Sequence, residues 1–79
     1  MMVNVVEKLS RSGATGPFKS EIVGVALTPT KARALAEQRA QSDGLRWTSE
    51  WIAGNDGDGW TRDAGEGLWF WIQPHAVVE

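Results

Sequence analysis

The pattern of apolar and polar positions predicts strands in both halves of the chain and one helix between them. Residues 3–9 are rich in β-branched side chains, which are typical of strands. A loop at 11–17, containing Gly and Pro, separates this run from a second predicted strand at 21–27. Because successive side chains of a strand point to opposite faces, Val23, Val25 and Leu27 are expected to share one face. The two strands are expected to pair as a long-looped hairpin.

A helix is predicted between Thr28 and Gly44. Thr28 suits the N-cap position and Pro29 the first helical position, and Gly44 suits the left-handed residue that ends a helix. Four apolar residues recur at helical spacing, and they are Ala32, Leu35, Ala36 and Ala40. Four polar residues fall outside this stripe and are expected to face water, and they are Lys31, Glu37, Gln38 and Gln41. The narrow, alanine-rich stripe favours close packing on a sheet.

The second half of the chain predicts further strands separated by turns. Residues 45–53 alternate with period two, which indicates a strand. Turn-forming segments at 54–59 and 63–67 enclose a short predicted strand at 60–62. The last strand, 68–73, is apolar on both faces, with Leu68, Phe70 and Ile72 on one and Trp69, Trp71 and Gln73 on the other. Pro74 is expected to end regular pairing.

These elements predict a single α+β domain spanning residues 1–79. The order β-β-α-β-β-β in so short a chain favours a small two-layer domain. We expect an antiparallel sheet of four to five strands with one helix across one face. The segments 21–27 and 68–73 are expected to supply the apolar side chains beneath that helix.

The tryptophans indicate where a function would lie. All five fall between Trp47 and Trp71, and tryptophan is over-represented at binding surfaces. One helix covers one face of a sheet, so Trp69 and Trp71 are expected to point away from it, and the strand register allows Trp47 and Trp51 to join them. A strand that is apolar on both faces is normally packed against other groups on both faces. The cover would be a second copy of the chain, a ligand or partner, or the chain itself in a strongly curled sheet.

Charge is divided unevenly between the two halves of the chain. The net charge is −2, but residues 1–46 hold seven basic and four acidic side chains, whereas residues 47–79 hold one basic and six acidic. Chance variation on a solvated surface explains this division. The alternative is an acidic, Gly-rich rim beside the tryptophans that meets a basic partner. The residues of that rim are Asp56, Asp58, Asp63 and Glu66.

The composition argues against most catalytic and metal chemistries. The chain has no cysteine and one histidine, His75, so thiolate nucleophiles, disulfides and common zinc sites lack their residues. The segment 13–20 departs from a phosphate-binding loop because Phe18 precedes Lys19 and a strand follows. A calcium-binding loop that begins at Asp56 fails at its fifth, sixth and twelfth positions. An irregular cation site in the acidic rim remains an alternative, although turn chemistry explains the same residues. We therefore expect no enzyme, no cofactor and no bound metal.

Nucleic acid and membranes are not expected partners. Aromatic side chains on a sheet can stack bases, but the tryptophan-bearing half is acidic, whereas phosphate backbones need basic grooves. No run approaches the ~20 apolar residues of a membrane span, and residues 1–9 lack the apolar region of a signal peptide. We therefore expect a soluble, cytoplasmic protein.

The sequence thus predicts a non-catalytic interaction module. The predicted binding face holds Trp47, Trp51, Trp69 and Trp71, with Trp60 as a further candidate and the acidic rim at its border. Homodimerisation through this face is the leading hypothesis. The alternative is a small acidic accessory or inhibitor protein that binds a protein, a small planar ligand or a sugar on the tryptophans.

Overall fold

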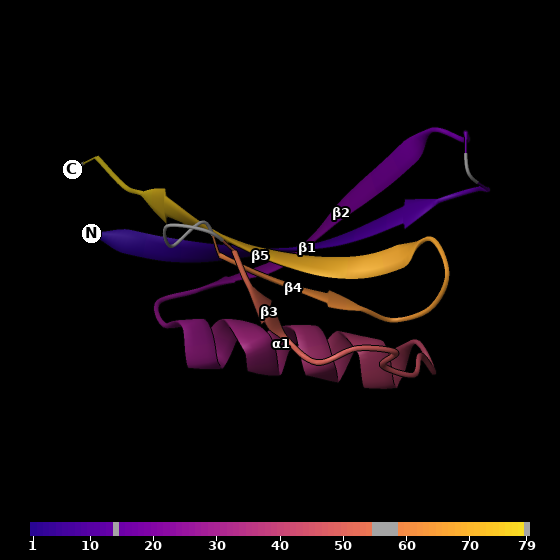
Figure 1. Ribbon diagram of the computed structural model, residues 1–79. Helices are drawn as coiled ribbons and strands as arrows, with labels where there is room; N and C mark the ends of the chain where they lie inside the picture. The colour runs from indigo at the N-terminus through magenta and orange to yellow at the C-terminus, as the bar shows by residue number, and fades with distance from the viewer. Residues whose placement is uncertain (14, 55–58, 79) are drawn as a thin grey trace.

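A five-stranded antiparallel sheet lies on one helix in the computed structural model, which describes residues 1–13, 15–54 and 59–78 (Figure 1). The elements in chain order are β1 (Met2–Arg11), β2 (Phe18–Ala26), α1 (Pro29–Ser42), β3 (Ile52–Ala53), β4 (Trp60–Asp63) and β5 (Leu68–Ala76). The strand order across the sheet is β2-β1-β5-β4-β3. The α+β class, the order of the elements and the single covering helix agree with the prediction from sequence.

The first and last strands form the centre of the sheet. β1 and β5 pair over nine positions, from Met2↔Ala76 to Ser10↔Leu68. The largest fully buried side chains, Val6, Phe70 and Ile72, come from these two strands. Because Val6 pairs with Ile72 and both are buried, the centre of the β1–β5 pair is also the centre of the hydrophobic core.

The helix begins and ends where the sequence predicts. The Thr28 hydroxyl accepts a hydrogen bond from the Lys31 backbone N–H, at 3.2 Å, which satisfies one of the unpaired donors of the first turn. Gly44 has a φ of +69° directly after the C-cap residue Asp43, a conformation that suits glycine. The helix turns three of its four alanines, Ala32, Ala36 and Ala40, into the core.

The face of β2 that meets the helix differs from the prediction. Val23 packs on the core, but Val25 and Leu27 are exposed, and Ala26 packs there instead. The cause is a register shift between Val6 and Glu7, where β2 has one residue more than its partner strand. The residue opposite Val6 is then Gly24, which lets the helix approach so closely that an added Cβ would lie 3.1 Å from Leu35 Cδ1.

The predicted strand at 45–53 is largely wrong. Only Ile52–Ala53 pair with β4, and residues 45–51 cross the molecule as a loop on the helix side of the sheet (Figure 1). Leu45, Trp47 and Trp51 pack against the core from this loop. The period-two alternation of residues 45–53 therefore reflects a loop with one buried side. A paired strand with one buried face produces the same alternation.

Pro74 does not end the last strand, as was expected. β5 continues to Ala76, and Pro74 pairs with Asn4 of β1. The last residue of β5 that pairs with β4 is Ile72. Beyond it β5 has a neighbouring strand on one side only, so proline interrupts no ladder between β5 and β4.

Four charged residues join the end of the helix to the sheet. The Asp43 carboxylate accepts from Lys8 Nζ of β1 at 2.7 Å and from Arg39 Nε at 2.9 Å, and Arg39 also pairs with Glu21 of β2. The hydrogen bond from Lys8, followed by that from Arg39, holds the pKa of Asp43 below its ordinary value of 3.8, against the effect of desolvation. These contacts fix the orientation of the helix C-terminus on β1 and β2.

Candidate interaction surface

Within the described residues, one face of the sheet has no covering element, and we call it the open face. In Figure 1 the helix and the 45–51 loop lie below the sheet, and no helix lies above it. The side chains that alternate away from the buried Val6, Phe70 and Ile72 define this face. They are Val3, Val5, Glu7, Leu9 and Arg11 of β1, Phe18, Ser20, Ile22 and Val25 of β2, Ile52 of β3, Thr61 and Asp63 of β4, and Trp69, Trp71, Gln73 and His75 of β5.

The open face is predominantly apolar. Phe18 is 58% exposed, Ile22 66% and Val25 56%. Beside them lie Leu9 and Trp69, which pair across β1 and β5. Scattered exposed apolar residues are normal on proteins, but a continuous apolar face marks a binding surface. The apolar side chains of the open face are adjacent across its strands, which is typical of binding surfaces.

The five tryptophans divide between the two faces of the sheet, which corrects the prediction of a single face. Trp47 and Trp51 lie on the helix side, where the Trp47 ring meets Phe70 at a centroid distance of 5.3 Å. The Trp51 Nε1 donates to Glu37 Oε1 of the helix at 3.3 Å. Trp60 packs on the same core. Only Trp69 and Trp71 belong to the open face, because they alternate with the buried Phe70 and Ile72.

Two arginines hold the helix-side tryptophans in place. The Arg62 guanidinium lies 4.3 Å from the Trp47 ring centroid, and its Nε donates to the Ser49 carbonyl oxygen at 2.8 Å. The Arg33 guanidinium lies 4.7 Å from the Trp60 ring centroid. Cation–π contacts of this kind add to the packing. These three tryptophans therefore serve the core, and the residues that can meet a partner are Trp69 and Trp71.

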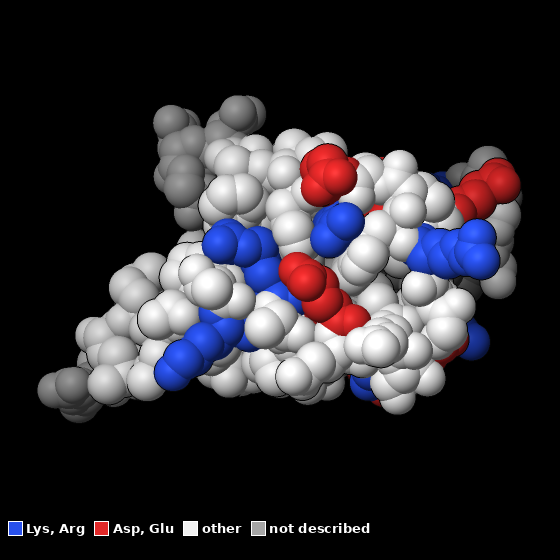
Figure 2. Space-filling model, turned by 90° about the horizontal axis from the view of Figure 1, so that it is seen from below, with Lys and Arg blue, Asp and Glu red and all other residues white. Residues whose placement is uncertain are grey.

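Charged side chains are much denser on the helix side than on the open face. Figure 2, which views the molecule from the helix side, shows basic and acidic side chains interspersed there. On the open face the described strands carry Glu7, Arg11 and Asp63 as their Asp, Glu, Lys and Arg residues. Two of these charged residues lie on β1, Glu7 two residues before Leu9 and Arg11 two residues after it. The few charges of the open face thus have defined positions within an apolar surface.

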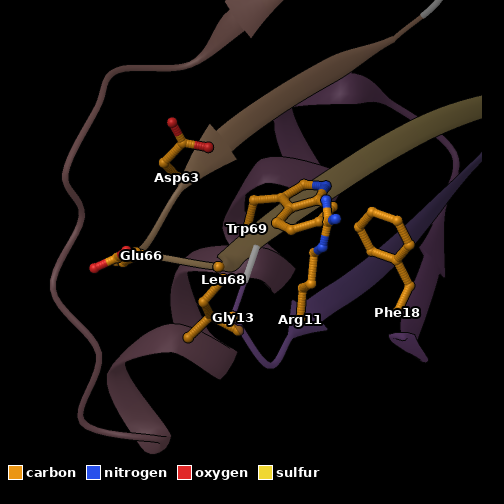
Figure 3. A pocket seen from close by; sticks show the side chains of 9 residues that line it. Arg11, Gly13, Phe18, Asp63, Glu66, Leu68 and Trp69 are labelled. Atoms are coloured by element: carbon orange, nitrogen blue, oxygen red, sulfur yellow. The ribbon is translucent and has the colours of Figure 1, made fainter. Parts of the chain in front are cut away.

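A hollow of about 590 Å³ lies at one end of the open face (Figure 3). Its aromatic wall is Trp69 and Phe18, whose rings meet edge to face at 5.4 Å. The Arg11 guanidinium lies 4.9 Å from the Phe18 ring centroid and beside the Trp69 indole. Gly67, which contributes no side chain, also borders the hollow. The hollow thus places an aromatic wall beside one cation, and aromatic side chains can stack on flat rings.

The structure places half of the predicted acidic rim beside this hollow. Asp63 at the end of β4 and Glu66 in the following turn both border it. Asp56 and Asp58 lie outside the described residues, so their part in a rim or a cation site stays a prediction. Among the described residues no group of three or more His, Cys, Asp or Glu side chains is arranged to hold a metal ion.

Sequence reasoning missed the β1 and β2 half of the open face. The predicted binding face does not include Glu7, Leu9 or Ile22, and the loop from Arg11 to Phe18 is a candidate surface only if the tryptophans are already covered. The period-two pattern of residues 3–11 places Glu7, Leu9 and Arg11 on one face, and the pairing of β1 with β2 adds Phe18 and Ile22. The pairing of the first strand with the last, which brings them beside the tryptophans, has no local signal in the sequence.

The chain was compared with protein-family models, with curated proteins and with solved structures, and none of the three comparisons gave a match. Within the described residues no helix is both long and apolar enough to cross a membrane.

Proposed function

We propose that this protein is a non-catalytic interaction module that binds another protein chain through the open face. The observation that carries the proposal is an apolar sheet face, centred on Trp69 and Trp71, that no other part of the described chain covers. A sheet of this kind gains stability when its second face is packed against another surface.

The size of the open face supports a protein partner. Its three long strands have nine or ten residues each, which corresponds to a length of about 30 Å. Five strands at about 4.8 Å spacing give a width near 20 Å. Because β3 and β4 are shorter, with two and four residues, the outline is about 500 Å² before the relief of the side chains is counted. This is of the same order as the ~800 Å² that each partner buries in a standard interface.

The composition of the face supports the same function. Its centre holds two tryptophans, the residue type most enriched among the side chains that dominate binding energy. The surrounding aliphatic side chains of Leu9, Ile22 and Val25 would exclude water from them. Rigid aromatic groups at the centre of a face lose little conformational entropy when a partner covers them.

Site-specific photo-crosslinking tests the proposal in cells that express the chain. A photoreactive phenylalanine analogue at Ile22, which is 66% exposed on the open face, should give discrete adducts with a protein. The same analogue at Gln41, an exposed helix residue, is the matched control and should not. Trp69→Ala combined with Trp71→Ala should abolish the adduct. Equal adducts from both positions, or none from Ile22, would contradict the proposal.

A second candidate function is the binding of a small planar ligand or sugar in the hollow beside Trp69. The favouring observation is the aromatic wall of Trp69 and Phe18 next to Arg11. Titration of the purified chain with indole and with glucose, followed through the tryptophan and Arg11 NMR signals, tests it. Saturable shifts confined to the hollow would support this function, and unchanged spectra would rule out both probes.

A further inference from the structure

We infer that the partner on the open face is a second copy of this chain, packed sheet to sheet about a two-fold axis close to Leu9 and Trp69. This inference rests on the proposed function and specifies its occupant. It follows from what lies on either side of the Leu9↔Trp69 pair along β1 and β5.

The two sides of this pair carry opposite charges. Glu7 lies two positions before Leu9 in β1, and Arg11 lies two positions after it. Consider a two-fold axis that passes over Leu9. It lies in the plane between the two sheets and runs perpendicular to the strands. Rotation about this axis places position 7 of one copy opposite position 11 of the other. Glu7 of each copy then faces Arg11 of the other, and the symmetric interface contains this pairing twice.

The two sides also differ in shape. Glu7 pairs with Trp71, whereas the Arg11 backbone N–H donates to the Gly67 carbonyl oxygen at 2.8 Å. The same axis therefore sets the Trp71 indole of each copy over Gly67 of the other. That position borders the hollow of about 590 Å³ lined by Arg11, Phe18 and Trp69. A large side chain on one copy meets a residue without a side chain on the other.

Other positions of the axis fit less well. An axis at the Glu7↔Trp71 pair would set the two Glu7 carboxylates against each other in an apolar interface, which is unfavourable. Packed sheets keep their strands within about 30° of each other, so the register of side chains close to the axis is retained.

Charge exchange between two variants tests the inference with the purified full chain. Sedimentation equilibrium should show that Glu7→Arg and Arg11→Glu each weaken self-association by at least about tenfold, because each sets like charges together twice. An equimolar mixture of the two should associate as tightly as the wild type, since one copy supplies two arginines and the other two glutamates. Glu50→Arg, the same change on a side chain 93% exposed outside the open face, is the control and should leave association unchanged.

A second variant covers the case in which Arg11→Glu does not fold. Trp71→Ala removes the side chain that enters the hollow and should weaken association by at least about tenfold, with the circular dichroism of the helix retained. A wild type that stays monomeric, or a mixture that fails to recover association, overturns the inference. If the monomeric chain still gives an Ile22 adduct with a different protein, the proposed function stands; if Ile22 gives no adduct of any kind, both fail.

Discussion

The indole of Trp47 packs edge-on against the ring of Phe70, with the two centroids 5.3 Å apart. Trp47 reaches this position from a loop, and Phe70 from the buried side of β5. Trp47, together with Trp51 and Trp60, packs on the core of this domain. The helix contributes mainly alanines to the same core. Trp69 and Trp71 are thereby left as the tryptophans of the open face.

Replacement of Trp47 should therefore destabilise the fold. We expect Trp47→Ala to lower the free energy of unfolding by about 2–4 kcal/mol, because it removes a partly buried indole that packs on Phe70 and under Arg62. Urea unfolding followed by circular dichroism measures this. A loss below about 0.5 kcal/mol would contradict a core role for Trp47.

Replacement of Trp71 should weaken association and leave the free energy of unfolding nearly unchanged. In dilute solution, where the chain is monomeric, Trp71→Ala should change the free energy of unfolding by less than about 1 kcal/mol. Its effect should instead appear as weaker association at high concentration. A loss in dilute solution as large as that of Trp47→Ala would mean that the indole supports the core.

Gly24 should tolerate no branched side chain. An added Cβ already lies 3.1 Å from Leu35 Cδ1, so Gly24→Val would force the helix away from β2. We expect a loss of about 1–3 kcal/mol in urea unfolding, as for other overpacked cores. Lys19→Val, in the same strand but exposed and outside the open face, is the matched control and should be close to neutral. Equal effects of the two substitutions would refute the close approach of helix and strand.

Stability should fall at acid pH partly through Asp43. Its pKa in the folded chain is held below the ordinary value of 3.8, first by the hydrogen bond from Lys8. A carboxyl whose pKa is lowered on folding contributes stability above 3.8 that is lost as the pH falls through the folded value. Asp43→Asn should therefore be less stable than the wild type at neutral pH and nearly equal to it near pH 2, by urea unfolding. A difference that is the same at both pH values would contradict this role.

The helix and the fold class could be predicted because their signals are local. Thr28, Pro29 and Gly44 mark the helix by backbone chemistry alone. The two faces of β5 could also be separated, because alternation is a property of one strand. The face of Trp47 and Trp51 could not be predicted, since a covering loop and a strand give the same alternation.

The open face itself required the pairing of distant strands. Leu9 and Trp69 are neighbours only because β1 pairs with β5, a contact between the two ends of the chain. The register shift at Val6 and Glu7 likewise reverses which residues of β2 face the helix, and Val25 is exposed as a result. The sequence indicated that Trp69 and Trp71 need cover and wrongly placed Trp47 and Trp51 beside them. The strand register identified Glu7 and Arg11 as neighbours on that face.

The most direct test of the account is the solution mass of the wild type and of the Trp69→Ala, Trp71→Ala double variant. Sedimentation equilibrium over a wide concentration range measures both. We predict that the wild type approaches twice the chain mass of 8.6 kDa, whereas the folded double variant remains at the mass of its own single chain. A wild type that stays at 8.6 kDa, or a double variant that associates equally well, would contradict the claim that the open face joins two copies of this chain.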